Sequence, residues 1–297
     1  MKKPIYVLIT SLILGSCASL TKTQISAVNE FAQTSKKISV YPSKIIAVLN
    51  EIHIKNGIIT ASTYTDNIVR EKAILNVVQF KVKNDIVTTK LNLSFQIIDK
   101  YAQSLLLISS DKHTKDIDSL ASNFGAGIDS LISIYKSIDK ETKIPDGFGA
   151  AIGKLISLSG KQYIKIKQAN EIKKLIPQAD VLLVSMTNNI DNYLSETATS
   201  LLTSYGDEAK TNYEELLKQN KASIENDKDY FQLLTNIHYV EELRKEIITT
   251  IKDIQIAHDK LCEIIGKRTC LKKPVHEIQV FKEDVKKMKS TITKLTF

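Results

Sequence analysis

The C-terminal part of the chain carries apolar residues at the spacing of a helix seam. In the last segment the apolar positions alternate three and four residues apart: Ile278, Phe281, Val285, Met288, Ile292 and Leu295. The preceding segment repeats this alternation with Ile247, Ile251, Ile254, His258, Leu261 and Ile265. This is the a/d pattern of helices that pack side by side as in a coiled coil. The short connection at 266–273 predicts antiparallel neighbours, and Pro274 suits the start of the second helix, where no N–H is needed.

The rest of the chain contains few residues that break helices. Only ten glycines and five prolines occur in 297 residues, and the stretches 58–124 and 207–265 contain neither. Helical patterns also cover 117–138 and 149–175, with a loop at 140–148 between them, and Pro177 is expected to open a further helix. We therefore predict an all-α fold: an elongated antiparallel helical bundle with coiled-coil-like packing and about five to seven helices.

Two short segments leave the choice between helix and strand open. Segment 52–59 holds Asn56-Gly57 between apolar runs, which is a hairpin signal, and 77–82 alternates like a strand. Two isolated strands would be only marginally stable in an otherwise helical chain. We therefore predict that both segments are mainly helical.

The N-terminus has the layout of an export signal. Lys2 and Lys3 precede an apolar run from Ile5 to Leu14. This run is shorter than the roughly 20 apolar residues that a membrane-spanning helix needs. Residues 1–16 are therefore predicted to be a signal peptide and do not enter the fold argument.

The segment Leu14-Gly15-Ser16-Cys17 resembles the lipobox of bacterial lipoproteins. The resemblance implies that Cys17 receives a diacylglycerol thioether and becomes an acylated, palmitate-type N-terminus after cleavage. Two or more acyl chains give stable membrane anchoring. Ala18 follows where an Asp would signal inner-membrane retention, which favours the outer membrane. The alternative is an ordinary signal peptide followed by a chance cysteine.

The mature chain is expected to have a simple organisation. Residues 17–24 are predicted to be a lipidated tether, and 25–297 a single helical domain. Segments 97–108 and 152–177 resemble helical-bundle lipoproteins of the bacterial envelope whose activity is unknown. That resemblance implies the envelope location and the helical fold, and it transfers no functional residue.

Basic residues are concentrated at the C-terminal end. Removal of the signal peptide leaves 39 basic and 33 acidic residues, and 266–297 holds nine of the basic and three of the acidic ones. An anionic envelope surface is a candidate partner for this end, and nucleic acid is not expected because aromatic-interleaved basic motifs are missing. The alternative is a solvated helix face. The candidate contact residues are Lys282, Lys286, Lys287 and Lys289.

The two cysteines besides Cys17 can form a disulfide only if the helix that contains the first of them ends before the second. Cys262 and Cys270 would lie about 12 Å apart in one continuous helix, too far to bridge. If Gly266 ends the helix, the chain can turn back and bring the two sulfurs together. The alternative is two separate buried thiols.

A glycine-rich segment suggests a phosphate loop but does not match one. Phe148 stands at the first Gly position of that motif, and Leu155 stands at its Ser/Thr position. Gly149, Gly153 and Ser157 instead lie four residues apart on one helix face. They predict close packing of two helices, with 123–127 as the opposite small-residue surface.

The histidines do not occur in metal-binding or catalytic patterns. His258 lies on the predicted seam and is expected to be a hydrogen-bonded core residue, and His238 with Glu242 an ordinary surface pair. No catalytic residue, metal or cofactor is therefore predicted, and the chain is expected not to be an enzyme.

These patterns favour a membrane-anchored envelope lipoprotein that binds a protein or an envelope polymer through its helix faces. One alternative is a bundle that binds a small ligand in a cavity lined by Tyr101, Tyr135 or Tyr163. The other is a membrane-active helical toxin in which 148–160 is an apolar tongue.

Overall fold

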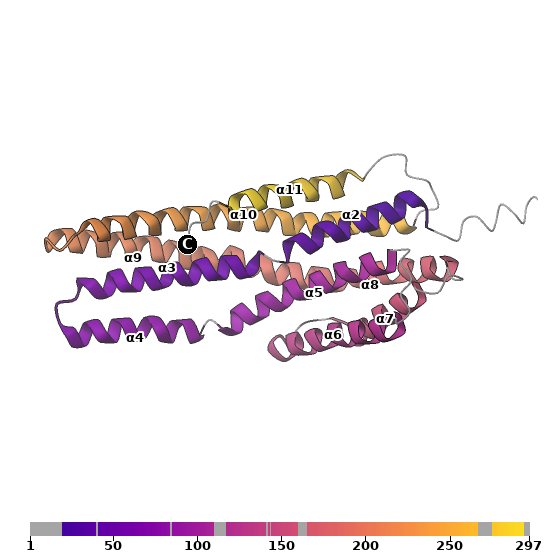
Figure 1. Cartoon of the computed structure of the whole chain (residues 1–297), viewed down its shortest axis with the longest axis horizontal. Helices are drawn as coiled ribbons and strands as arrows, with labels where there is room; N and C mark the ends of the chain where they lie inside the picture. The colour runs from indigo at the N-terminus through magenta and orange to yellow at the C-terminus, as the bar shows by residue number, and fades with distance from the viewer. Residues whose placement is uncertain are drawn as a thin grey trace, which may run out of the picture. The chain divides into compact units, whose positions relative to one another are not determined.

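The computed structural model describes residues 20–39, 41–83, 85–109, 117–140, 142, 144–159, 165–266 and 275–293. All regular secondary structure within these ranges is helical, which confirms the predicted all-α class (Figure 1). The described helices include none with the length and hydropathy of a transmembrane span. The predicted signal peptide, Cys17, Tyr163 and Cys270 lie outside the described residues.

The helices follow one another with short connections. The elements are α2 (Lys22–Ile38), α3 (Pro42–Thr63), α4 (Asn67–Lys83), α5 (Asp85–Ser109), α6 (Ile117–Ile138), α7 (Phe148–Ser159), α8 (Lys165–Asn192), a π-helical turn (Tyr193–Ala198), α9 (Thr199–Lys218), α10 (Ile224–Gly266) and α11 (His276–Ile292). Segments 52–59 and 77–82 fall inside α3 and α4, so the helical interpretation of both is confirmed. The predicted helix at 117–138 and the loop at 140–148 are also found.

The long stretches without Gly or Pro are divided by side-chain caps. The Asp66 carboxylate accepts hydrogen bonds from the backbone N–H groups of Ile68 and Val69, at 2.7 and 3.2 Å, and so begins α4. Ser223 and Asn226 cap each other reciprocally at the start of α10. Asp and Ser accept the N–H groups that a helix start leaves unpaired. For this reason 58–124 and 207–265 each form more than one helix.

Pro177 does not open a helix, contrary to our expectation, because it lies within α8. Its neighbours Ile176 and Ala179 are fully buried, whereas Pro177 itself faces solvent. A proline inside a helix costs about 3 kcal/mol. Burial of the flanking apolar residues offsets that cost, so tertiary packing keeps the helix continuous.

Two compact units make up the described part of the chain. The first contains described residues of 1–38, 96–187 and 252–282, and the second those of 39–95, 188–251 and 283–297. The largest fully buried side chains of the first unit include Phe31, Tyr101, Tyr135 and Phe281. The core of the second unit contains Ile45, Ile52 and Leu91.

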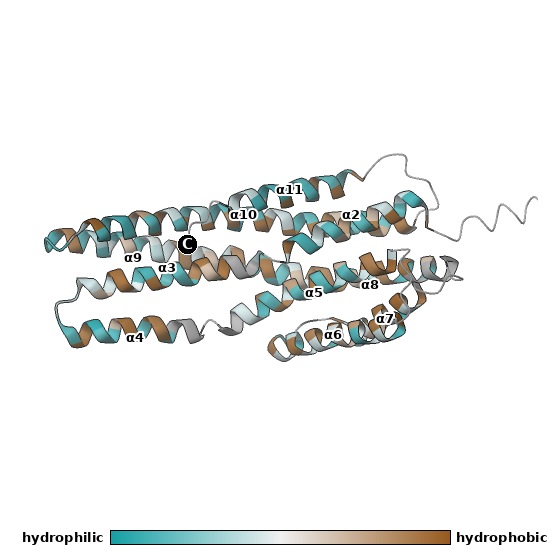
Figure 2. Cartoon of the chain, viewed as in Figure 1, coloured by the Kyte–Doolittle hydropathy of each residue, from teal (hydrophilic) through white to brown (hydrophobic). Residues whose placement is uncertain are grey.

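The predicted seams of α10 and α11 are buried. Every seam residue that the structure describes is at most 6% exposed, and Leu295 lies outside the described residues. Apolar and polar residues alternate along the ribbons of both helices (Figure 2). Ion pairs join the two helices in each unit, Lys260 with Glu277 at 3.9 Å and Glu246 with Lys287 at 3.7 Å. The heptad spacing therefore identified the buried side of both helices.

Candidate functional site

A chain of polar groups lies in the core of the first unit. His258 of α10 is fully buried, and its Nε2 lies 2.8 Å from the hydroxyl oxygen of Tyr101 on α5. Its Nδ1 lies 3.4 Å from Oδ1 of Asp180 on α8. A carboxylate only accepts hydrogen bonds, so the ring donates from Nδ1 to Asp180; in the tautomer with its hydrogen on Nδ1, Nε2 accepts from the hydroxyl of Tyr101. The prediction that His258 is a hydrogen-bonded core residue is thereby confirmed.

The ionisable groups around His258 influence one another. The hydrogen bond from His258 lowers the pKa of Asp180, although burial of the carboxyl opposes this shift. Burial raises the pKa of Tyr101 well above its usual range, so the phenol keeps its proton. In the row Asp180–His258–Tyr101, Asp180 is thus an ionised acceptor at the partly exposed end, and Tyr101 is a neutral phenol at the buried end.

Cys262 is the fourth polar residue of this cluster. Its Sγ lies 3.9 Å from Nδ1 of His258, one helical turn away on α10. Burial, reinforced by the charges of Asp180 and Asp259, raises the pKa of the thiol to about 11. A reactive cysteine needs a lowered pKa, since the thiolate is the nucleophile. The thiol of Cys262 is therefore held in its unreactive, protonated form.

Aromatic rings surround the buried imidazole. The ring centroids of Phe31 and Tyr101 lie 5.6 and 5.7 Å from that of His258, and Phe281 packs on Phe31. Tyr101 also lies 6.4 Å from Phe148. A fully satisfied polar network inside an apolar core makes the packing of its helices unique. The cluster thus joins α2, α5, α8 and α10 within the first unit.

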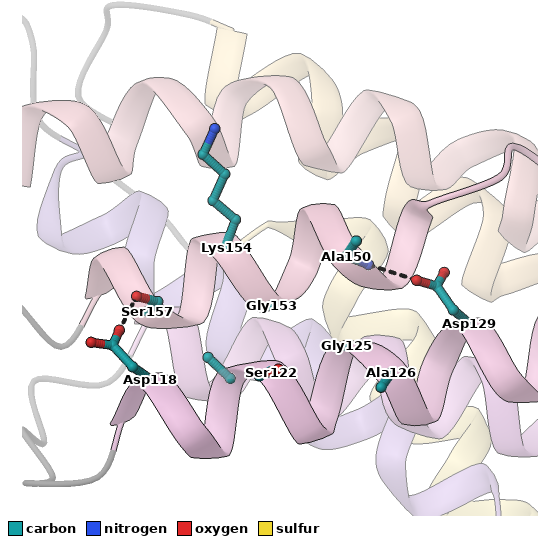
Figure 3. Close-up of a pocket in the computed structure, with 10 residues that line it drawn as sticks. Asp118, Ser122, Gly125, Ala126, Asp129, Ala150, Gly153, Lys154 and Ser157 are labelled. Carbon is teal, nitrogen blue, oxygen red and sulfur yellow. Dashed lines mark hydrogen bonds between the residues drawn. The ribbon is translucent and has the colours of Figure 1, made fainter.

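The predicted small-residue surfaces of α6 and α7 lie face to face (Figure 3). A Cβ atom added to Gly125 would lie 2.5 Å from the carbonyl oxygen of Gly149. One added to Gly153 would lie 2.6 Å from the carbonyl oxygen of Ala121. Contacts under about 3 Å leave no room for a side chain, so both positions require glycine. Ser157, the third residue predicted for this face, donates a hydrogen bond to Asp118.

A carboxylate from α6 caps the start of α7. Oδ1 of Asp129 accepts from the N–H of Gly149 at 2.7 Å, and Oδ2 accepts from that of Ala150 at 2.9 Å. The negative charge also complements the positive end of the helix dipole. The sequence did not reveal this cap, because Asp129 lies twenty positions before Gly149 instead of directly before the helix.

The two helices leave an open groove of about 440 Å³ beside their contact. Its polar lining residues are Asp118, Ser122, Asp129, Lys154 and Ser157, among alanines and glycines. Both carboxylates already have partners, and Lys154 extends away from α6 (Figure 3). The glycine-rich segment 148–155 thus serves the packing of α7 against α6.

Three of the four lysines of α11, Lys282, Lys286 and Lys287, have carboxylate partners. Lys282 lies 2.6 Å from Glu30 of α2, and Lys286 lies 2.6 Å from Glu283. Burial alone would raise the pKa of Glu30, but hydrogen bonds from Lys282 and Gln279 outweigh burial and lower it. With Lys287 paired to Glu246, the charge that α11 offers to an anionic surface is smaller than the sequence suggests. Contact of this end with such a surface stays a prediction.

A stripe of exposed apolar residues marks the start of α10 in the second unit. Ile224 and Phe231 are 68% and 72% exposed, and Leu234 on the same side is also exposed. The adjacent Tyr230 stacks on Tyr213 of α9 with a ring separation of 4.2 Å. This stack fixes the α9–α10 hairpin while Phe231 faces solvent.

Within the described ranges, no group of three or more His, Cys, Asp or Glu side chains is arranged to hold a metal ion. No protein-family model, curated protein or solved structure matches the chain.

Proposed function

We propose that this chain is a lipid-anchored lipoprotein of the bacterial envelope, placed in the outer membrane, and that its helical body is a non-enzymatic interaction module. The lipobox-like segment Leu14–Cys17 behind a short apolar run supports the anchor. The single observation that carries the interaction role is the exposed stripe Ile224, Phe231 and Leu234 on α10.

The stripe has the composition of a protein-binding surface. Aromatic side chains dominate the energy of protein interfaces when a partner desolvates them. A polar rim usually surrounds such an apolar centre. Here the exposed charged residues Lys228 and Glu225 lie beside the stripe on α10. The stack of Tyr213 on the adjacent Tyr230 holds the hairpin in place, so a partner would meet a preformed surface.

The anchor is tested by mass spectrometry of the native protein extracted from membranes. We expect the N-terminal peptide to begin at Cys17 and to carry a diacylglycerol group and a further acyl chain. A Cys17→Ser variant should lose this mass and be released from the membrane fraction. An unmodified N-terminus in the native protein would contradict the proposal.

The interaction role is tested by site-specific photo-crosslinking in intact cells. A benzophenone amino acid at position 231 should give one discrete adduct with another protein. The matched control carries the same amino acid at Val181, an exposed apolar position on α8. The proposal predicts no such adduct from position 181. Equal adducts from both positions, or none from 231, would refute the role of the stripe.

A further inference from the structure

Helix α4 of the second unit has apolar residues on two opposite sides. One side packs on α3, where Val77 contacts Gly57 so closely that a Cβ on the glycine would overlap it. Ala73 and Val77, the half-buried residues of α4, lie on this side. The other side carries Ile68, Ile74, Leu75 and Val78, which are all between 46% and 64% exposed.

Of the five exposed large apolar residues that the structure describes on α4, four form one band, and the fifth, Val69, lies outside it. At 3.6 residues per turn, Ile74, Val78, Leu75 and Ile68 share an arc of about 120° that faces away from α3. A surface helix in a globular protein normally presents polar residues on that side. Another protein surface or a lipid surface can therefore bury this band.

A cation lies at each border of the band. By helical register Lys72 lies about 40° beyond Ile68 at one border. Arg70 lies about 40° beyond Ile74 at the other border, towards the side of Val77, and both cations are exposed. An apolar band bordered by cations is typical of helices that lie in the interface of anionic membranes. The cations reach the phosphates while the apolar residues enter the acyl boundary. The helix therefore has both elements that binding to an anionic lipid surface requires.

The same charges oppose pairing of two copies of α4. Symmetric contact of two such bands would bring cationic borders together, and like charges in contact repel. Anionic lipid headgroups instead complement both borders. Tyr64, exposed just before α4, adds an aromatic side chain of the kind that favours the headgroup region. Charge complementarity therefore selects a lipid surface as the occupant.

We propose that the band Ile68, Ile74, Leu75 and Val78 of α4 docks on an anionic phospholipid surface, with Arg70 and Lys72 binding headgroup phosphates. This goes beyond the proposed anchor at Cys17 and does not require it. When the anchor is present, it raises the effective concentration of α4 at the same membrane. Glu71 lies within the band and opposes docking by its charge.

The chain contains no Trp, so one introduced tryptophan reports from a single place. The test uses the mature chain 17–297 with Cys17→Ser, so that no acyl group contributes and failure of the anchor proposal cannot affect the result. Leu75→Trp is mixed with vesicles of phosphatidylcholine and phosphatidylglycerol in equal parts, or of phosphatidylcholine alone. Val181→Trp is the matched control, because Val181 is exposed and apolar but lies on α8.

We expect the emission of Leu75→Trp to shift to the blue and to be quenched by brominated lipids in the anionic vesicles only. Val181→Trp should show neither effect. Arg70→Gln and Lys72→Gln should each weaken partitioning roughly fivefold, since a cation near an anionic surface contributes about 1 kcal/mol. Glu71→Gln should strengthen it.

Three results would overturn the proposal. The first is no spectral change of Leu75→Trp at saturating anionic lipid while the chain keeps its helical circular dichroism. The second is equal quenching of the Val181→Trp variant, which indicates unspecific adsorption. The third is a blue shift that occurs without vesicles and grows with protein concentration, which assigns the band to contact between copies.

Discussion

The hydroxyl oxygen of Tyr101 lies 2.8 Å from Nε2 of His258, and both side chains are completely enclosed in the core of the first unit. A buried imidazole nitrogen without a donor would keep the full penalty of its lost hydration. The bond therefore makes the buried histidine compatible with an apolar seam and ties α5 to α10.

We expect Tyr101→Phe to lower the free energy of unfolding by about 1–3 kcal/mol, because it leaves Nε2 of His258 buried without a donor. Urea denaturation followed by circular dichroism measures the change. Tyr64→Phe removes the same hydroxyl at an exposed position and should stay within about 0.5 kcal/mol of the parent. Equal stability of both variants would show that the buried hydrogen bond contributes nothing.

Gly153→Ala should destabilise the first unit by about 1–3 kcal/mol, because the new Cβ would lie 2.6 Å from the backbone oxygen of Ala121. Alanine is the better helix former by about 1 kcal/mol, so the loss must come from the forced separation of α6 and α7. Gly127→Ala is the matched control on α6, since no atom lies within 4 Å of its added Cβ. Thermal unfolding should rank Gly127→Ala at or above the parent. A Gly153→Ala protein as stable as its control would refute the close contact.

Asp129→Ala should remove both hydrogen bonds at the start of α7 and cost about 0.5–2 kcal/mol. Asp129→Asn keeps one acceptor oxygen and should lose less. Hydrogen exchange resolves the effect, because the amides of Gly149 and Ala150 should lose protection first. Unchanged protection of these two amides in Asp129→Ala would contradict the assigned cap.

A second charged contact predicts how stability depends on pH. In the second unit Glu241 binds Arg244 through two hydrogen bonds of 2.6 and 2.7 Å, and Arg244 also donates to the carbonyl oxygen of Leu194. The hydrogen bond from Arg244 lowers the pKa of Glu241 below its ordinary 4.5, although burial opposes this. A lowered folded pKa means that the contribution of Glu241 is complete above pH 4.5 and is lost as the pH falls towards the folded pKa.

Glu241→Gln should therefore lower the unfolding free energy by about 1–2 kcal/mol at pH 7 and reduce its decline below pH 4.5. Urea unfolding between pH 3 and 7 is the measurement. Glu214→Gln, an exposed glutamate on α9, is the control and should keep the parent's pH profile. If Glu241→Gln also follows the pH profile of the parent, then the contact with Arg244 does not lower the pKa of the Glu241 carboxyl.

The structure has Cys262 as a free thiol, whereas the sequence predicts a disulfide with Cys270, and thiol labelling decides between the two. If the disulfide forms in oxidatively purified Cys17→Ser protein, both remaining cysteines react only after denaturation and reduction. The control sample is denatured but not reduced. Unfolding removes the burial that raises the pKa of Cys262, so a free thiol would react in this sample. Two thiols that label in denaturant without reductant would refute the bond.

Several features were readable from local sequence because they depend on residues within a few turns. The alternation of three and four residues marked the buried sides of α10 and α11, and His258 was correctly placed on that seam. The loop before Phe148 followed from its Pro and Gly residues. Asp66 and Ser223 are capping residues that can be recognised in the sequence. The absence of Gly and Pro around them nevertheless favours uninterrupted helices, so these two helix starts were not predicted.

Spacing along the chain therefore settled the helical class and the inward side of the C-terminal helices, because periodicity is a property of the segment itself. Which residues pair with one another across the core was decided only by the tertiary structure. Tyr101 meets His258 from 157 positions away, Asp129 caps a helix that is not its own, and Pro177 stays in α8. Such contacts arise when separate segments pack, and their energies outweigh the local preferences that a sequence displays.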